Sequence, residues 1–294
     1  MTAQRDAGHL RRVLLKHARD AFVSDERIQD QWRALGYLAP PDYARACDEY
    51  ERFAAVFEER GVSIEWMPAE DIGLDSIYVR DASIASDHGV IGGSMGKGAR
   101  AAEPARQLAH LTEAGIPCAS SIRFPGSVEG GDCAWLNEST LAVGRGYRTN
   151  ARGIEQLRGL LPSAELLEVS LPHWKGPGDV FHLMSIVSPL ADRIALVYRP
   201  LLSVPFVEWL QENDYTLVDV PDEEFESQGG NVLALSPDAV LALDGNPRTR
   251  RRIEAAGFEV VTYEGVEISQ KGCGGPTCLT RPLSWVSEDP AAGS

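Results

Sequence analysis

Three residues, far apart in this chain, are of the types that thiol-based catalysis uses. Cys278 follows the turn-forming run Gly274-Gly275-Pro276, which can present a side chain into a cleft because glycine reaches backbone angles closed to other residues. His182 lies in an apolar run, and Glu129 precedes two glycines. A thiol attacks carbon only as a thiolate, so it needs a partner such as His182 to control its proton. The combination predicts a nucleophilic cysteine whose histidine and acid partners meet it in space.

Two carboxylates, Asp81 and Glu129, are expected in the same cleft as the thiol. An unpaired buried carboxylate is costly, and a planar cation with several N–H groups would satisfy both acids. A guanidinium is therefore the ligand that fits best. The alternative is that Arg80 or Arg148 neutralises these acids in a structural ion pair. Arg100 and Arg148 are also candidates for binding a substrate carboxylate through paired hydrogen bonds.

The elements that must position these residues follow a repeated pattern. Segments starting at Gly131, Gly178 and Gly230, roughly fifty residues apart, each predict two strands, a helix and a further strand. The helices are expected near residues 150–161, 204–213 and 247–256, and His182 is expected inside a strand over 180–187. Weaker copies are predicted from residue 75, with a helix near 103–114, and from Gly275 onward, pairing with an N-terminal strand over 10–15.

One such unit cannot bury its apolar face alone, so a closed ring of five units is expected, with strands inside and helices outside. The predicted fold class is α/β: a five-bladed α/β propeller of ββαβ-type units around a pseudo-five-fold axis, forming one catalytic domain over residues 1–294. The starts of the inner strands would then bring together Asp81, Glu129, His182, Asn231 and Cys278. Asp132 is expected to support the turn at its strand start.

Two further segments are predicted from local signals. Residues 24–60 are expected to form two helices separated by Pro40 and Pro41, the second starting at Asp42 and packing an apolar stripe into the core. Residues 288–294, rich in small and polar residues, are expected to form a flexible tail.

Composition excludes several functional classes. Forty-three acidic against 28 basic side chains give a net charge of −15, which repels nucleic acid and anionic membranes and attracts a small cationic substrate. Five irregularly spaced cysteines and six histidines without metal-binding spacing predict reduced thiols and no metal. With neither a membrane-spanning apolar run nor a signal-peptide core, the protein is expected to be cytoplasmic. Its expected oligomeric state is a monomer or a homodimer.

Several motifs in this order resemble the guanidino-group-modifying (pentein) superfamily, and within it the dimethylarginine dimethylaminohydrolases. The resemblance runs from about residue 10 to about residue 284. The motifs that carry it lie at residues 75–81, 128–132, 144–150, 181–183, 230–231, 247–250 and 274–280.

The resemblance implies a five-bladed propeller that needs no metal or organic cofactor. It makes Cys278 the nucleophile, His182 the general acid and base, and Glu129 the carboxylate of the triad, also in contact with substrate. It further assigns Asp81 to the guanidinium, Asp75 to the substrate α-ammonium, and Arg100 and Arg148 to the α-carboxylate. Phe22 is expected to line the pocket, and Asn231 and Asp132 to support the site.

Two positions depart from the family pattern. Arg80 stands where dimethylarginine hydrolases usually have an acid, as in arginine deiminases and amidinotransferases. Those relatives carry His-x-Asp, whereas Met184 occupies the place of that second aspartate here. With one polar contact to the guanidinium missing, the sequence favours an alkyl-substituted guanidinium over unsubstituted arginine.

The implied activity is hydrolysis of the guanidino group of arginine or an Nω-substituted arginine. A covalent thiouronium on Cys278 would give a ureido product such as citrulline, together with an amine. Three alternatives stay open: an amidinotransferase, in which an amine replaces water; an arginine deiminase; and a non-catalytic propeller that binds an amino acid.

Overall fold

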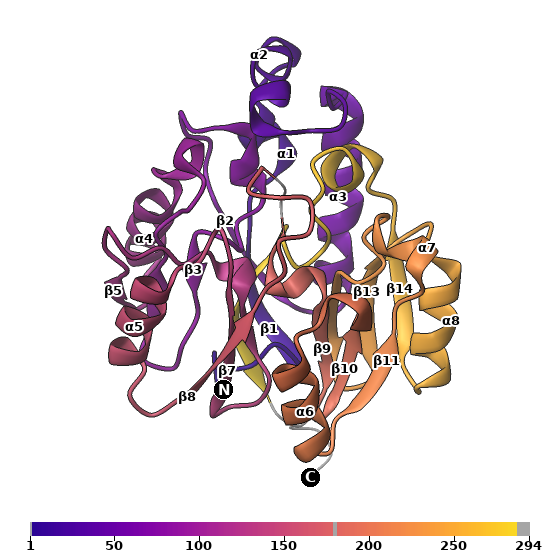
Figure 1. Ribbon diagram of the computed structural model, residues 1–294. Coiled ribbons are helices and arrows are strands. Elements are labelled where there is room, and N and C mark those ends of the chain that lie inside the picture. Colours follow the sequence, from indigo (N-terminus) through magenta and orange to yellow (C-terminus); the bar gives the residue numbers. More distant parts are fainter. Residues whose placement is uncertain (1, 179–180, 287–294) are drawn as a thin grey trace.

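The protein is described here by a computed structural model over residues 2–178 and 181–286. Within these residues the strands form five sheets of three strands each (Figure 1). In hydrogen-bonded order the sheets are β15 (Arg281–Val286), β1 (His9–Leu15) and β2 (Ser63–Trp66); β3 (Ser83–Ile84), β4 (Val90–Gly92) and β5 (Cys118–Ser121); β6 (Cys133–Trp135), β7 (Thr140–Arg145) and β8 (Glu165–Ser170); β9 (Val187–Ala191), β10 (Ile194–Val197) and β11 (Thr216–Asp219); and β12 (Val232–Ser236), β13 (Ala239–Leu243) and β14 (Glu259–Tyr263).

All five sheets share one plan. The central strand pairs antiparallel with one neighbour and parallel with the other. Parallel neighbours need a crossover connection, and in each crossover one helix directly precedes the parallel strand. These helices are α3 (Tyr43–Glu59), α4 (Glu103–Glu113), α5 (Ala151–Leu160), α6 (Val204–Glu212) and α8 (Pro247–Ala255). The repeated unit predicted from the sequence is therefore present five times in the described residues.

The remaining helices are short or lie outside the repeat. They are α1 (Ala18–Phe22), α2 (Asp25–Leu35) and α7 (Asp222–Phe225). The two helices expected over residues 24–60 are α2 and α3, which begin after the caps Ser24 and Asp42; each cap side chain accepts a hydrogen bond from the first helical turn. The predicted tail, 288–294, lies outside the described residues.

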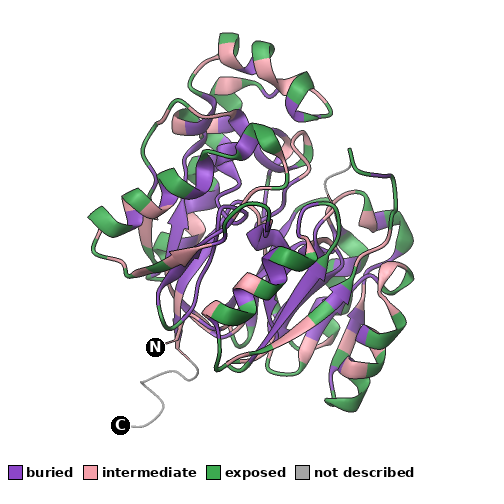
Figure 2. Ribbon diagram, turned by 60° about the vertical axis from the view of Figure 1, so that its left-hand side comes forward, coloured by how far each residue is buried: buried purple, intermediate pink, exposed green. Residues whose placement is uncertain are grey.

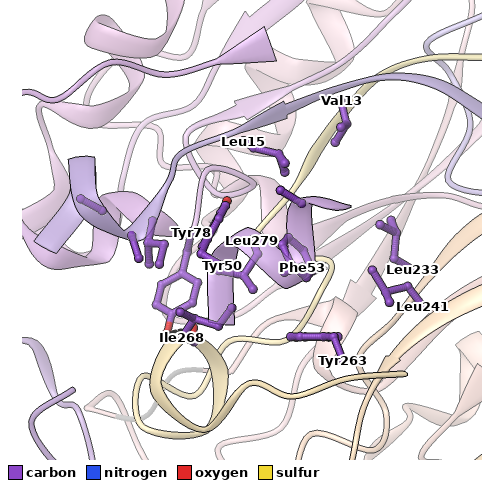
Figure 3. Packing of buried hydrophobic residues seen from close by; sticks show 14 of the residues in the cluster. Val13, Leu15, Tyr50, Phe53, Tyr78, Leu233, Leu241, Tyr263, Ile268 and Leu279 are labelled. Atoms are coloured by element: carbon purple, nitrogen blue, oxygen red, sulfur yellow. Dashed lines mark hydrogen bonds between the residues drawn. The ribbon is translucent and has the colours of Figure 1, made fainter. Parts of the chain in front are cut away.

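The largest core cluster joins the N-terminal helices to the segment that carries Cys278. From α3, Tyr50 and Phe53 pack inward, and the ring of Phe53 lies 4.8 Å from that of Tyr263 (centroid to centroid). Tyr78 and Leu279 belong to the same cluster (Figure 3). Burial follows this layering, since the strands are mostly buried and the helices expose their outer faces (Figure 2). Leu279, the residue directly after Cys278, thus anchors this segment in the packed core.

One predicted strand is wrong. Instead of lying in a strand over 180–187, His182 precedes the 3₁₀ turn Leu183–Ser185, and β9 starts only at Val187. The physical reason is a side-chain contact: Asp132 Oδ1 accepts a hydrogen bond from the backbone N–H of Leu183 at 3.0 Å, which fixes a turn there.

No helix in the described part of the chain has both the length and the apolar character needed to cross a lipid bilayer.

The core also contains a buried ion pair that predicts a large stability effect. Arg80 and Asp6 are both nearly inaccessible and pair through Nη2 and Oδ1, while Asp6 Oδ2 accepts the N–H of Trp135 at 2.8 Å. Asp6→Asn leaves the Arg80 charge buried without a counter-charge, and we expect a loss of about 3 kcal/mol in the free energy of unfolding. Urea denaturation should show this loss as a lower urea concentration at the midpoint of unfolding.

The control for this prediction is Glu138→Gln, which breaks the exposed pair between Arg5 and Glu138. It should cost less than about 1 kcal/mol. Equal losses for the two variants would contradict the role given to Asp6.

Candidate active site

A tight turn presents Cys278. The N–H of Leu279 donates to the carbonyl of Gly275, and that of Thr280 to the carbonyl of Thr277. The turn fits its surroundings only because it is rich in glycine: a Cβ on Gly274 would lie 2.4 Å from the ring of Tyr78. Glycine is therefore required where the chain passes this closely.

Asn231 holds the sulfur of Cys278 in place. Its Nδ2 lies 3.3 Å from Cys278 Sγ, and its Oδ1 accepts from both the backbone N–H (3.0 Å) and the hydroxyl (2.7 Å) of Thr277. Asn231 itself immediately precedes β12. The expected support role of Asn231 thus corresponds to a direct contact with the thiol.

His182 and Glu129 form a buried pair. The ring Nε2 of His182 lies 2.7 Å from Glu129 Oε2, while Glu129 Oε1 accepts the backbone N–H of Lys97 at 3.1 Å. Glu129 is completely buried. Burial alone would lower the pKa of His182, but the charges of Asp81, Asp132 and Glu129 raise it to about 9. His182 is therefore positively charged at neutral pH and can deliver a proton.

The pKa of Glu129 moves the opposite way. Burial would raise it, but the hydrogen bond and charge of His182 outweigh burial and lower it to about 2. Glu129 stays ionised throughout the physiological range and serves as a fixed counter-charge to the imidazolium.

Asp81 lies on the other side of the imidazole. Its Oδ1 is 3.8 Å from His182 Nδ1 and accepts the N–H of Gly131 at 3.1 Å. A Cβ on Gly131 would lie 2.6 Å from that oxygen and 2.7 Å from the ring nitrogen. Only glycine leaves room for Asp81 and His182 to approach each other here.

Arg100 faces inward onto carboxylates. Its Nη1 pairs with Asp81 Oδ2, and its Nε and Nη2 bind both oxygens of Glu103 at 2.9 and 2.7 Å. Nη2 also donates to the carbonyls of Asp75 (3.2 Å) and Tyr78 (2.9 Å). In this structure Arg100 therefore neutralises Asp81, and its predicted binding of a substrate carboxylate stays a prediction.

The ion-pair alternative for the acids of the cleft holds in part. Arg148 lies by Glu129, with Nη1 3.5 Å from Oε2, whereas Arg80 points away from the site toward Asp6. The partner of Asp81 is Arg100, which the sequence alternative did not name.

These groups surround one small cavity. The lining residues are Leu35, Asp75, Tyr78, Asp81, Lys97, Arg100, Arg148, His182, Gly272, Cys273, Gly274 and Cys278. The structure thus brings the thiol, the imidazole and a carboxylate from three distant segments to one opening. Glu129 lies behind His182 and not on the wall.

Phe22, which was expected to line the pocket, lies elsewhere, and so does Met184, which occupies the place of the second aspartate. Phe22 is fully buried in the main core cluster with its ring 6.4 Å from that of Tyr37, and it does not line the cavity. Met184 is buried in a different core cluster. In both cases the side chain packs into the core, where an apolar group gains most from leaving water. Phe22 is accordingly corrected to a core residue.

Lys97 is a lining residue that sequence reasoning missed. It stands alone between Gly96 and Gly98, without periodicity or motif to mark it. Its Nζ contacts Asp75 Oδ2 and the carbonyl of Leu35, both at 2.6 Å. Only the fold reveals this proximity, because Asp75 lies in the 3₁₀ turn Leu74–Ile77 and Lys97 precedes a separate one, Gly98–Arg100.

The thiol itself is held neutral. Burial and the charge of Asp81 raise the pKa of Cys278, while contacts with Asn231, Thr277 and the backbone at Gly275 lower it in part. A cation bound against Asp81 would cancel one of the two causes that raise the pKa. The site is thus suited to form its thiolate when a cationic ligand arrives.

The same atoms meet the distance requirement for a metal site. Asp81, Glu129 and His182 offer ligand atoms within 4.8 Å of one another. Those atoms are already used, however: His182 Nε2 pairs with Glu129, and both oxygens of Asp81 accept hydrogen bonds. With Arg100 and Arg148 adjacent, the arrangement suits proton transfer and cation binding better than a metal ion.

Comparison with known proteins agrees with this geometry. A family model described as arginine deiminase matches residues 179–284. The N(G),N(G)-dimethylarginine dimethylaminohydrolase of Streptomyces coelicolor is 29% identical over 246 residues, covering 81% of this chain and 86% of that protein.

Two solved structures share the fold. The dimethylarginine dimethylaminohydrolase (DDAH) of Pseudomonas aeruginosa, in complex with citrulline, superimposes with a TM-score of 0.74 at 22% identity, covering 92% of this chain and 98% of that one. An amidinotransferase from Microseira wollei reaches a TM-score of 0.76 at 16% identity, covering 96% of both chains.

Five sheets of one plan, and a cavity with a thiol, an imidazole and paired acids, stand beside these matches. The chain is similar to proteins of the guanidino-group-modifying superfamily. Within that superfamily it is similar to the dimethylarginine dimethylaminohydrolases.

Proposed function

We propose that the protein is a cysteine-dependent amidine hydrolase that acts on the guanidino group of arginine or an Nω-substituted arginine. The observation that carries the proposal is the single cavity on which Cys278, His182 and Asp81 meet. The relatives named dimethylarginine dimethylaminohydrolase support it, as does the citrulline in one of their structures.

The reaction proceeds in two halves on Cys278. In the first, the guanidinium binds against Asp81, the Cys278 thiol loses its proton to solvent, and the resulting thiolate attacks the central carbon of the guanidinium. The charged His182 donates its proton to the departing amine, which leaves a covalent thiouronium. In the second half, the now neutral His182 takes a proton from water, whose oxygen attacks the same carbon. Collapse releases a ureido product such as citrulline and restores the thiolate.

The other site residues position these groups. Glu129 fixes the His182 ring and stabilises its charge, and Asn231 orients the sulfur. Asp132 holds the turn after His182 through Leu183. Arg148, on the cavity wall, is proposed to bind the substrate carboxylate.

A product screen by mass spectrometry tests this function. Incubation with arginine and methylated arginines should give a ureido product with release of ammonia or a methylamine, which also separates deiminase from dimethylargininase activity. Adding an amine acceptor tests the transferase alternative, which would give a new guanidine instead of a ureido compound. A protein that binds these compounds and converts none would be a non-catalytic binder, contrary to the proposal.

The pKa values predict a pH profile. At neutral pH Cys278 is protonated and His182 is charged, and the reactive form is the thiolate beside the imidazolium. Because the pKa of Cys278 is raised, kcat/KM should rise with pH and level off near the His182 pKa of about 9, where His182 loses its proton. Glu129→Gln removes one source of the raised His182 pKa, so the rising limb should level off at lower pH. The measurement is kcat/KM against pH for both proteins.

Glu168→Gln, which removes an exposed acid paired with Arg145, is the control and should leave the profile unchanged. Because a profile's shape does not depend on the fraction of folded enzyme, partial unfolding cannot produce the shift. An unmoved rising limb in Glu129→Gln would contradict the role of Glu129.

We also propose that the five sheets close into the propeller expected from the repeat. Three sheet-to-sheet contacts support it: β1 with β12, β12 with β9, and β9 with β6. Closure around an axis would explain why Asp81, His182 and Cys278, each next to a different sheet, face one cavity.

A further inference from the structure

The cavity wall carries an ion pair that bears on substrate choice. Lys97 Nζ lies 2.6 Å from Asp75 Oδ2, and both residues line the cavity. Their side chains are 19% and 7% exposed, so the pair is largely shielded from water. Charge–charge interactions are strongest where water is excluded.

Lys97 is held in this position from three directions. Its Nζ also donates to the carbonyl of Leu35 at 2.6 Å, and its backbone N–H donates to Glu129 Oε1 at 3.1 Å. Gly96 lets the loop approach, since a Cβ there would lie 2.7 Å from the carbonyl oxygen of Arg148. The ammonium of Lys97 is therefore a built part of the cavity wall.

This placement opposes a second ammonium. Asp75 is the residue expected to bind the α-ammonium of an amino-acid substrate, yet the carboxylate already has its own ammonium partner in Lys97. A substrate ammonium would have to displace Lys97 or lie beside a like charge in a shielded site, and both are costly.

The cavity wall also offers partners for an anion. A lysine ammonium has three donors, and two of those on Lys97 are used by Asp75 and Leu35. Arg148 also lines the cavity and pairs with Glu129 only at 3.5 Å, leaving its guanidinium able to bind a carboxylate bidentately. A carboxylate there meets two cations.

We propose that Lys97 is a specificity-determining residue, which makes the preferred substrates guanidino carboxylic acids without an α-ammonium group. This inference rests on the proposed function and refines the substrate class. Asp75 then holds Lys97 in place, and the α-ammonium of an amino-acid substrate would find no carboxylate of its own to pair with.

Three ligands with the same guanidino side chain separate the contributions. Arginine carries both head groups, δ-guanidinovalerate only the carboxylate, and agmatine only the amine. Calorimetric titration of the Cys278→Ser protein, which retains the cavity, should show δ-guanidinovalerate binding at least about tenfold tighter than arginine, with agmatine weakest. If arginine binds more tightly than δ-guanidinovalerate, the inference is wrong.

Variants of Lys97 in that background test whether it causes the preference. Lys97→Met keeps the side-chain length and removes the charge, so agmatine and arginine should bind more tightly and δ-guanidinovalerate more weakly. The ratio of the affinities for arginine and δ-guanidinovalerate should shift about tenfold toward arginine. Lys97→Arg keeps the charge and should preserve the parent order. Each preference is a ratio within one protein, so a loss of folded fraction does not imitate it.

The outcomes separate this inference from the function beneath it. If guanidines bind and are converted by the wild-type protein but Lys97→Met leaves the ratio unchanged, the inference fails and the proposed function stands. If no guanidine in the set binds and none is converted, both fail.

Discussion

Replacing Cys278 with serine is expected to lower turnover of any guanidino substrate by about 10⁴-fold or more, while the fold persists. A serine hydroxyl is far less acidic than a thiol and forms no useful amount of nucleophile beside His182. The side chain is similar in size, and Asn231 can still donate to its oxygen. Steady-state kinetics measures the loss, and circular dichroism with a thermal melt checks the fold.

The matched control is Cys118→Ser, a thiol near the carbonyl of Leu108 and away from the cavity. It should keep wild-type turnover. Mass spectrometry after exposure to a haloacetamidine should find the label on Cys278 in preference to the other four cysteines, and no label at that position in Cys278→Ser. Full activity in Cys278→Ser would end the proposed mechanism.

Removing the imidazole of His182 is expected to block both halves of the reaction. In His182→Ala the departing amine receives no proton and the attacking water loses its base, so kcat should fall by about 10²–10⁴-fold with normal guanidines. An analogue whose leaving group is a thiol needs little protonation to depart. It should still react with Cys278, but the resulting thiouronium should persist.

Intact-protein mass spectrometry detects this adduct in His182→Ala and, because hydrolysis is fast there, finds little of it in the wild type. His110→Ala is the control, since His110 pairs with Glu65 outside the cavity. An analogue turned over equally well by His182→Ala and wild type would exclude His182 as the base for water.

Much of the fold followed from local signals. Ser24 and Asp42 are cap residues before apolar periodic runs, and the structure starts helices directly after them. The apolar runs after Gly230 and Gly131 each predicted two strands, and the structure contains both pairs. Such features depend on neighbours in the chain, so the sequence encodes them directly.

The segment around His182 shows where local sequence signals no longer predict the secondary structure. Its apolar composition favoured a strand, yet the hydrogen bond between Asp132 and Leu183 makes a turn. A contact across 51 positions outweighed the local preference. Phe22 likewise went to the core and not to the pocket, because the burial of an aromatic ring depends on which elements pack around it.

The amino-acid sequence alone specifies the reactive groups, which are a thiol, an imidazole and acids that favour a cation. It also contains a fivefold repeat able to bring these groups together. The tertiary structure decided the pairing of charges. Arg100 neutralises Asp81, Arg80 pairs with Asp6, and Lys97 pairs with Asp75. The energy of such pairs depends on distances of a few ångströms and on the exclusion of water. Neither quantity is written in the spacing of residues along a chain.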